Sequence, residues 1–251
     1  MPDHAAEFSS SQNVRILIDD LDIIKYSENR EEIEMKQYET YRCSKCGNEV
    51  EVGKVGGGTL ICCGEEMKCI TENLTMVNLM KAFAGESQAR NKYEYYAKVA
   101  QKEGYRDIAA HFQRAANNEK EHAKLELKLR NMMKDGENFG DTVANLKDAI
   151  AGESYENLTM YPDFAAVAEA EGKKEAARLF KAIGKVEVEH EKMYRELLER
   201  LESGKEYESE NEEEEWICEV CGHIHRGKKP PKVCPVCKHP QEYQSRLIEK
   251  K

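Results

Sequence analysis

The sequence predicts a mainly helical protein in which a four-helix bundle lies between two small cysteine-rich domains. Three observations predict this fold class. The nine cysteines form two clusters, separated by 148 residues (70–217) that contain no cysteine. The stretch between them is rich in Ala, Glu, Lys and Leu, with apolar residues at three- and four-residue spacing. It also contains one pattern twice, as expected for two helical hairpins.

Composition excludes several classes of protein. The chain has 251 residues, with 48 acidic against 38 basic side chains, so a nucleic acid is not expected as a partner. No apolar run approaches the ~18 residues needed to span a membrane, and the N-terminus lacks the basic start and apolar core of a signal peptide. We therefore expect a cytoplasmic protein without membrane contact, in which Cys-x-x-Cys pairs hold metal or carry out redox chemistry.

The C-terminal cysteines have the spacing of a metal site. Two Cys-x-x-Cys pairs, with twelve residues between them, are formed by Cys218, Cys221, Cys234 and Cys237. Four thiolates that converge in this way suit tetrahedral zinc or iron, and spacing alone leaves the metal open. Gly222, directly after the first pair, is expected to aim backbone N–H groups at sulfur.

The N-terminal cluster places two cysteines side by side. Cys43 and Cys46 form one pair, and the adjacent Cys62 and Cys63 are expected to complete a second four-thiolate site. Neighbouring side chains on a strand point to opposite faces, so both can reach one ion only if the backbone turns sharply. Such a pair is expected to distort the tetrahedron. Cys69 is left over, and we predict a small buried thiol there.

The repeat predicts a second kind of metal site. "AGES" occurs at 84–87 and 151–154, and residues 103–122 resemble 171–190, each ending in Glu-x-x-His. Helical rise brings each Glu-x-x-His motif within about one turn of the AGES glutamate of its own hairpin. Five glutamates and two histidines at one level of a bundle are what a dinuclear carboxylate site requires. These residues are Glu86, Glu119, His122, Glu153, Glu156, Glu187 and His190.

Several motifs carry a family resemblance. The segments "AFAGESQARNKYEY", "EKEH", "AGESYE", "MYPDFA" and "VEVEHEK", with the C-terminal cysteines, resemble rubrerythrin, a ferritin-like di-iron bundle followed by a rubredoxin-like iron–tetrathiolate domain. The segment "YRCSKCGNEVEVGKVGGGTLICCGEEM" resembles desulforedoxin and the first domain of desulfoferrodoxin. The combination is that of the desulforubrerythrins. It implies a ferritin-like four-helix bundle flanked by two small β-rich iron–tetrathiolate domains.

The resemblance also divides the chain. It implies an N-terminal extension of unknown role, a desulforedoxin-like domain, a ferritin-like bundle, an acidic linker and a rubredoxin-like domain, at residues 1–34, 35–71, 72–204, 205–215 and 216–251. The run "ESENEEEE" (208–215) is expected to be solvated. Residues 13–26 are expected to form a short amphipathic helix, and the start of the protein is expected at Met35.

The resemblance implies a role for each site residue. Glu119 and Glu187 would bridge two irons, Glu86 and Glu156 would bind one iron, and Glu153 with His190 would bind the other. In the family, the histidine at the position of His122 replaces the glutamate at the position of Glu156 on reduction. The tyrosines at the positions of Tyr93 and Tyr161 hydrogen-bond to the carboxylates.

The implied function is a peroxidase that reduces hydrogen peroxide to water in oxidative-stress defence. Electrons would come from NADH through a separate donor protein, rubredoxin or its reductase, and pass through the tetrathiolate irons. No GxGxxG motif opens a nucleotide-binding fold in this chain, so NADH is not expected to bind it directly. Two alternatives remain. One is a ferritin-like protein that oxidises and stores iron, and the other is a zinc-ribbon scaffold that binds partners through the basic loop 223–232.

The link between the two hairpins predicts an oligomer. Residues 135–141 span at most ~24 Å, whereas ferritin-like topology requires a return of ~34 Å along the bundle. Either the helix ends unwind, or the third and fourth helices pack into a neighbouring subunit. We expect at least a homodimer, with helices exchanged between chains.

Overall fold

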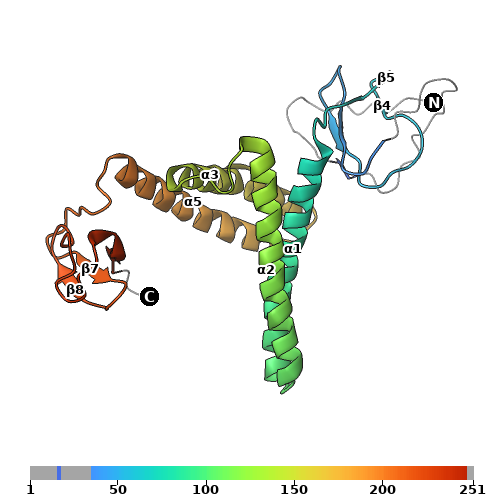
Figure 1. Cartoon of the computed structure of the whole chain (residues 1–251). Coiled ribbons are helices and arrows are strands. Elements are labelled where there is room, and N and C mark those ends of the chain that lie inside the picture. The colour runs from blue at the N-terminus through green and yellow to red at the C-terminus, as the bar shows by residue number, and fades with distance from the viewer. Residues whose placement is uncertain (1–15, 18–34, 248–251) are drawn as a thin grey trace. The chain divides into compact units, whose positions relative to one another are not determined.

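The computed structural model describes residues 16–17 and 35–247 (Figure 1). It forms two compact units, one that ends at Asn138 and one that begins at Phe139. The expected N-terminal extension lies outside the described residues apart from Ile16–Leu17. These two residues form a strand, so the helix expected over residues 13–26 is wrong at this point.

The first unit begins with a small β domain. Its main sheet has the strand order β1-β3-β2-β6, formed by β1 (Ile16–Leu17), β3 (Glu49–Glu51), β2 (Thr40–Arg42) and β6 (Lys68–Cys69). A separate hairpin joins β4 (Ile61–Cys62) to β5 (Glu65–Glu66). Four buried side chains form the core, namely Tyr41, Cys43, Val52 and Met67. One metal-site cysteine is therefore a core residue, so the fold of this domain and its metal site are built together.

An ion pair attaches this β domain to the first long helix, α1 (Leu74–Lys102). Lys81 Nζ lies 2.6 Å from the Glu51 carboxylate, which is buried, and 5.0 Å from the centre of the Tyr38 ring. The Asn73 side chain accepts a hydrogen bond from the Met76 N–H and so caps the start of α1.

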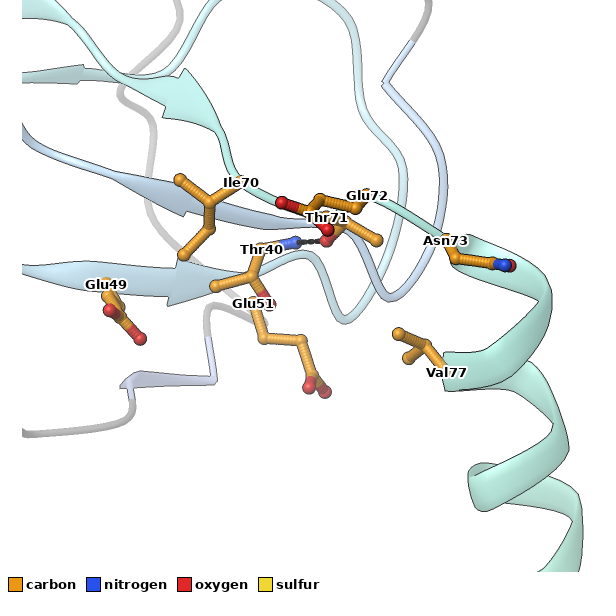
Figure 2. A pocket seen from close by; sticks show the side chains of 8 residues that line it. All are labelled: Thr40, Glu49, Glu51, Ile70, Thr71, Glu72, Asn73 and Val77. Carbon is orange, nitrogen blue, oxygen red and sulfur yellow. Dashed lines mark hydrogen bonds between the residues drawn. The ribbon is translucent and has the colours of Figure 1, made fainter. Parts of the chain in front are cut away.

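Figure 2 shows the hollow between the sheet and the first turn of α1. The Thr40 N–H donates to Thr71 Oγ1 across 2.7 Å at its upper edge. Because a buried carboxylate needs a charged partner, the Glu51–Lys81 contact ties the helix to the sheet.

Hairpin 1 consists of α1 and α2 (Arg106–Asp135), which pack along each other. The turn contains Gly104 at φ +89°, and the Tyr105 N–H donates to the Ala100 carbonyl. Only small side chains are buried in the seam, namely Ala97, Ala100, Ala116 and Ala123. The first of the two predicted helical hairpins is confirmed.

Hairpin 2 consists of α3 (Thr142–Tyr155), the π-helical turn η1 (Glu156–Met160), α4 (Tyr161–Ala170) and α5 (Lys174–Glu202). The turn contains Gly172 at φ +71°, and the Lys173 N–H donates to the Ala168 carbonyl, as in hairpin 1. The second predicted hairpin is also confirmed, but the π turn within its first arm was not predicted. Among the described residues, no helix is long and apolar enough to cross a membrane.

The second unit ends with a three-stranded sheet in the order β8-β7-β9, formed by β8 (Ile224–Arg226), β7 (Glu215–Cys218) and β9 (Gln244–Arg246). A 3-10 turn, η2 (Gln241–Tyr243), precedes β9. The Trp216 side chain is buried at its centre, and its Nε1–H donates to the Gly227 carbonyl.

The acidic run 208–215 packs against this C-terminal domain. Its carboxylates pair with basic side chains of the domain, in the pairs Glu208–Lys229, Glu212–Lys228, Glu214–Arg246 and Glu215–Arg226. The Ser209 N–H also donates to the Lys228 carbonyl. Residues 210–213 of the run are exposed, as expected, and the run also neutralises much of the basic loop.

Candidate metal centres

The N-terminal cysteines converge as predicted. The sulfur atoms of Cys43, Cys46, Cys62 and Cys63 all lie within 4.8 Å of one another. Cys46 and Cys62 are 3.6 Å apart, and Cys62 and Cys63 are 3.8 Å apart. A tetrahedron with metal–sulfur bonds of ~2.3 Å has edges of ~3.8 Å, so the four thiols fit one metal ion. The distortion expected from adjacent cysteines is absent along the Cys62–Cys63 edge.

A tight turn lets the two adjacent cysteines face one ion. Cys62 pairs with Glu65, so Cys63 and Gly64 are the two central residues of the β4–β5 hairpin. Both have positive φ, +53° and +78°, which is the pattern of a type I′ turn. Cys63 therefore occupies a left-handed position that a side chain rarely adopts. The sharp turn that the sequence required is confirmed, and it lies within the cysteine pair.

Backbone N–H groups prepare this site for thiolates. The Cys46 N–H hydrogen bond lowers the pKa of the Cys43 thiol to about 6, against the opposing effect of burial. Burial, followed by hydrogen bonds with Cys46 and Cys43, raises the pKa of Cys62 to about 12. A metal ion would be the largest positive charge in the site and would hold all four sulfurs as thiolates.

Cys69 does not belong to this group. It lies at the end of β6 and is exposed, so the predicted buried thiol is wrong. In the register of the sheet it is opposite Tyr41, at the edge of the core.

The C-terminal cysteines form a second four-thiol site. The sulfur atoms of Cys218, Cys221, Cys234 and Cys237 also lie within 4.8 Å of one another. Cys218 and Cys237 are 3.6 Å apart, and Cys221 and Cys234 are 3.7 Å apart, close to the same tetrahedral edge. Cys218 and Cys234 are buried, whereas Cys221 is exposed. One side of the site thus faces solvent.

All three Cys-x-x-Cys turns share one backbone conformation. The residue after the second cysteine has positive φ, and it is Gly47, Gly222 or Lys238. The Gly222 N–H donates to the Cys218 carbonyl rather than to sulfur. The donors to sulfur come from inside the turn, where the Cys237 N–H lowers the pKa of Cys234 to about 6. The predicted N–H donation to sulfur therefore occurs, but not from the glycine.

In hairpin 1, the structure brings together Glu86 from α1 and Glu119 with His122 from α2. His122 Nδ1 lies 2.8 Å from Glu119 and 3.7 Å from Glu86. One donor atom of each residue lies within 4.8 Å of the others. Two carboxylates and an imidazole are ligands that iron accepts.

Hairpin 2 repeats this trio with Glu153 from α3 and Glu187 with His190 from α5. His190 Nδ1 lies 2.7 Å from Glu187 and 3.7 Å from Glu153, nearly the same distances as in hairpin 1. Burial, and then the negative charge of Glu187, raise the pKa of Glu153. Glu156 is not one of these three close donors, although its charge also raises the pKa of Glu153.

Of the two predicted tyrosines, Tyr161 lies near the carboxylates of its trio. Burial, and then the charge of Glu156, raise the pKa of Tyr161, so its hydroxyl keeps its proton at neutral pH. A Cβ atom added to Gly184 of α5 would lie 3.1 Å from the Tyr161 Cβ, so any larger residue would have to push Tyr161 away. Tyr93 packs against Phe112 in hairpin 1. Among the described residues, neither hydroxyl forms a hydrogen bond to a carboxylate.

Sequence reasoning missed two features beside the trios. Glu126, one helical turn after His122, is mostly buried, and its Oε2 has no hydrogen-bond partner among the described residues. Burial, and then the charge of Glu86, raise its pKa. The other feature is the π turn η1. The sequence contained a sign of it, because Glu86 and Tyr93 are seven residues apart whereas the equivalent Glu153 and Tyr161 are eight apart, which indicates one inserted residue.

Comparisons with known proteins cover nearly all of the described chain. Family models match as rubrerythrin at residues 77–198, as the rubredoxin-like domain of rubrerythrin at 216–243, and as the N-terminal domain of desulfoferrodoxin at 35–70. A solved structure of nigerythrin in a mixed-valent state is 31% identical and covers 69% of this chain and 86% of its own. Its TM-score is 0.27, so it carries no weight for the arrangement of the helices.

Curated relatives agree with the family models. A putative rubrerythrin of Methanocaldococcus jannaschii is 42% identical over 192 residues, which are 70% of this chain and 94% of the relative. A rubrerythrin of Porphyromonas gingivalis is 46% identical over 71% of this chain and 92% of its own length. A desulfoferrodoxin of Nitratidesulfovibrio vulgaris is 61% identical over 36 residues, 14% of this chain and 29% of its own. The chain belongs to the rubrerythrin family, and iron is the metal that fits its carboxylate–histidine and tetrathiolate centres.

Proposed function

We propose that this chain is a non-haem di-iron peroxidase that reduces hydrogen peroxide to water. The observation that carries the proposal is the repeated trio. Two hairpins present the same two carboxylates and histidine at nearly identical distances, in a chain that also holds two tetrathiolate sites. The balanced reaction takes one peroxide, two electrons and two protons to two waters. Iron bound at the trios supplies the two electrons that break the O–O bond.

The side chains have distinct tasks in this proposal. If the family pattern holds here, Glu119 and Glu187, each beside the histidine of its own trio, would bridge the two irons. Glu86 and Glu156 would hold one iron, and Glu153 with His190 would hold the other. His122 would take the place of Glu156 on reduction.

Proton supply follows from the same geometry. The Nδ1 atoms of His122 and His190 face the carboxylates, so Nδ1 is the atom that each ring offers to metal. Both rings are about half exposed, which leaves the Nε2 edge free to exchange protons with water. Tyr161 keeps its proton at neutral pH, because burial, and then the charge of Glu156, raise its pKa, so its hydroxyl is available as a hydrogen-bond donor.

The tetrathiolate sites supply electrons one at a time in this proposal. Each site has a buried side and an exposed side, with Cys46 and Cys63 exposed at one and Cys221 at the other. An exposed ligand shortens the path from a donor protein to the metal. We infer that a reduced rubredoxin or its NADH-linked reductase docks at these faces.

Peroxide consumption by the reduced protein tests the proposal. Under anaerobic conditions with a rubredoxin reductase system, the wild type should consume peroxide while NADH is oxidised in equal amount. Glu119→Ala and Glu187→Ala should each lose turnover by more than about 100-fold, because each removes a bridging carboxylate. The tetrathiolate absorption should remain, since neither change touches a cysteine.

A matched control and an alternative outcome complete this test. Glu121 lies on the same helix as Glu119, is exposed and pairs with Lys124, so Glu121→Ala should keep wild-type turnover. A wild type that oxidises and retains a large excess of iron, but does not turn over peroxide, would support iron storage instead.

A further inference from the structure

The π turn η1 begins at a predicted metal ligand. Glu156 is its first residue, and the Glu156 carbonyl accepts the hydrogen bond of the turn from the Tyr161 N–H. A π turn interrupts the regular hydrogen-bond pattern of an α-helix, and single turns of this kind occur frequently at functional sites. The position of the Glu156 backbone therefore depends on how this turn is held in place.

One hydrogen bond ties η1 to the opposite helix of the hairpin. Asn157 Nδ2 donates to Glu191 Oε2 across 2.6 Å, and Glu191 lies on α5 with 17% of its side chain exposed. The other carboxylate oxygen of Glu191 accepts from Arg195 Nε across 2.8 Å. The Arg195 guanidinium also donates to Ser154 Oγ of α3 across 3.4 Å. One chain of hydrogen bonds thus joins α3, η1 and α5.

These hydrogen bonds lie directly beside the predicted metal site. Three of the four residues each follow a predicted ligand in the sequence, in the pairs Glu153–Ser154, Glu156–Asn157 and His190–Glu191. Successive side chains of an α-helix point about 100° apart, so neighbours of the ligands can bond to one another while the ligands face the metal. The contacts hold the backbone of the ligands without using a ligand side chain.

The equivalent positions of hairpin 1 carry side chains that cannot form this tie. Ala123 stands at the position of Glu191, and its methyl group forms no hydrogen bond. Arg90 stands at the position of Asn157, counted from the AGES glutamate, and it pairs with Glu94 on its own helix. The tie therefore accompanies the π turn, rather than the Glu-x-x-His motif that both hairpins share.

We propose that Asn157 and Glu191 are positioning residues for Glu156. Their hydrogen bond holds the backbone of η1 against α5, so that the Glu156 side chain can leave a metal and return to it without a shift of the helix. This inference rests on the proposed function, in which His122 takes the place of Glu156 on reduction. In the oxidised protein, ligation of the Glu156 carboxylate also holds η1. In the reduced protein that hold is released, so loss of the Asn157–Glu191 bond should matter most in the reduced state.

Asn157→Ala tests the proposal without changing any charge. Hydrogen exchange with mass spectrometry is measured anaerobically on the iron-loaded protein, for peptides that cover residues 153–162. In the reduced variant, exchange in this segment should be about tenfold faster than in the reduced wild type, because a hydrogen bond to a charged acceptor is lost. The difference should be clearly smaller in the oxidised state. Equal acceleration in both states would overturn the proposal, because the bond would then only support the fold.

A double-mutant cycle on the reduction potential gives a second, independent measurement. Asn157→Ala frees η1 once Glu156 is released, which favours the reduced form. A tenfold shift of this equilibrium raises the midpoint potential of that one-electron step by about 59 mV. Glu191→Ala breaks the same bond, so adding Asn157→Ala to it should change neither the potential nor the exchange any further. A second shift of full size in the double variant would refute the tie, because the two residues would then act independently.

Two further variants control the test and separate it from the proposed function. Glu189→Gln, at an exposed position of α5, should leave both the exchange and the potential at wild-type values. Glu156→Ala should remove the dependence of η1 exchange on oxidation state. If that dependence persists, Glu156 is not the released ligand and this inference fails. A wild type that shows the dependence but leaves peroxide intact would refute the peroxidase function alone, and the Asn157→Ala exchange would still decide the tie.

Discussion

Hairpin 1 and hairpin 2 place equivalent side chains in equivalent contacts. The ring centroids of Tyr93 and Phe112 lie 6.1 Å apart, and those of Tyr161 and Phe180 lie 6.3 Å apart. A second edge-to-face pair has a spacing of 5.6 Å in both hairpins, between Tyr96 and Phe112 and between Phe164 and Phe180. The histidine-to-glutamate distances repeat as closely. The two copies of the sequence repeat therefore also pack their side chains in the same way.

Hairpin 2 has one more residue than hairpin 1 between the equivalent glutamate and tyrosine, and the structure places this extra residue in the π turn η1. The repeat spacing is 67 residues at Glu86 and Glu153, but 68 at Tyr93 and Tyr161. An extra residue in an α-helix would rotate everything after it by about 100°. The π turn η1 absorbs the residue, so Glu153 and Tyr161 still share one face. A local change of backbone hydrogen bonding thus preserves the register of the site.

The largest effect is expected from single-residue deletions at two places in hairpin 2, one in the π turn η1 and one in the helix α5, because only the π turn holds the extra residue. Deletion of Leu158, which lies in η1 and is 75% exposed, should convert the π turn to α-helix and leave the protein folded. Deletion of the exposed Leu179 on α5 should rotate the segment before Glu187 and His190 out of register. We expect it to destabilise the protein by more than about 3 kcal/mol. Thermal unfolding followed by circular dichroism measures both, and equal losses would mean that η1 does not absorb the insertion.

An intermediate effect is expected where the hairpins differ in helix contact. Ala116 is fully buried in hairpin 1, and Gly184 occupies the equivalent position in hairpin 2. Ala in place of Gly in an open helical position stabilises by about 0.5–1 kcal/mol. Gly152→Ala should show this gain, because a Cβ there meets nothing within 4 Å. Gly184→Ala should lose stability instead, because its Cβ would press on Tyr161 at 3.1 Å. Urea unfolding of the two variants measures the difference, and equal gains would contradict the close approach.

Much of the fold and the candidate site follows from short-range pattern. Cysteine spacing and helical rise identified both thiol groups and both trios, because turns and helices fix such distances locally. The type I′ turn at Cys63 could also have been predicted from the sequence, because a two-residue hairpin loop that ends in glycine favours this turn type. The burial of Glu126 and the ion pairs of Glu208 and Glu212 depend on tertiary packing. No local pattern encodes those contacts.

The smallest effect is expected from a polar network that only hairpin 2 has. Glu191 accepts hydrogen bonds from Asn157 of η1 at 2.6 Å and from Arg195 at 2.8 Å, whereas Ala123 stands at the equivalent position of hairpin 1. Bonds from Ser154, Asn157 and Arg195 lower the pKa of Glu191 from 4.5 to about 2. A carboxyl with a lowered pKa stabilises the fold above its unfolded pKa, and this contribution is lost as the pH falls through the folded pKa.

Glu191→Gln should therefore lower the unfolding midpoint at pH 7, because a neutral amide binds Arg195 less well and leaves η1 less firmly held. The difference from the wild type should shrink as the pH falls below 4.5 toward 2, where the wild-type carboxylate also loses its charge. Glu189→Gln, at an exposed position of the same helix, is the control and should show little difference at any pH. Unfolding midpoints of the three proteins between pH 7 and pH 3.5 measure the trend. A constant gap between Glu191→Gln and the wild type would show that hydrogen-bond geometry, rather than the charge of Glu191, holds the π turn.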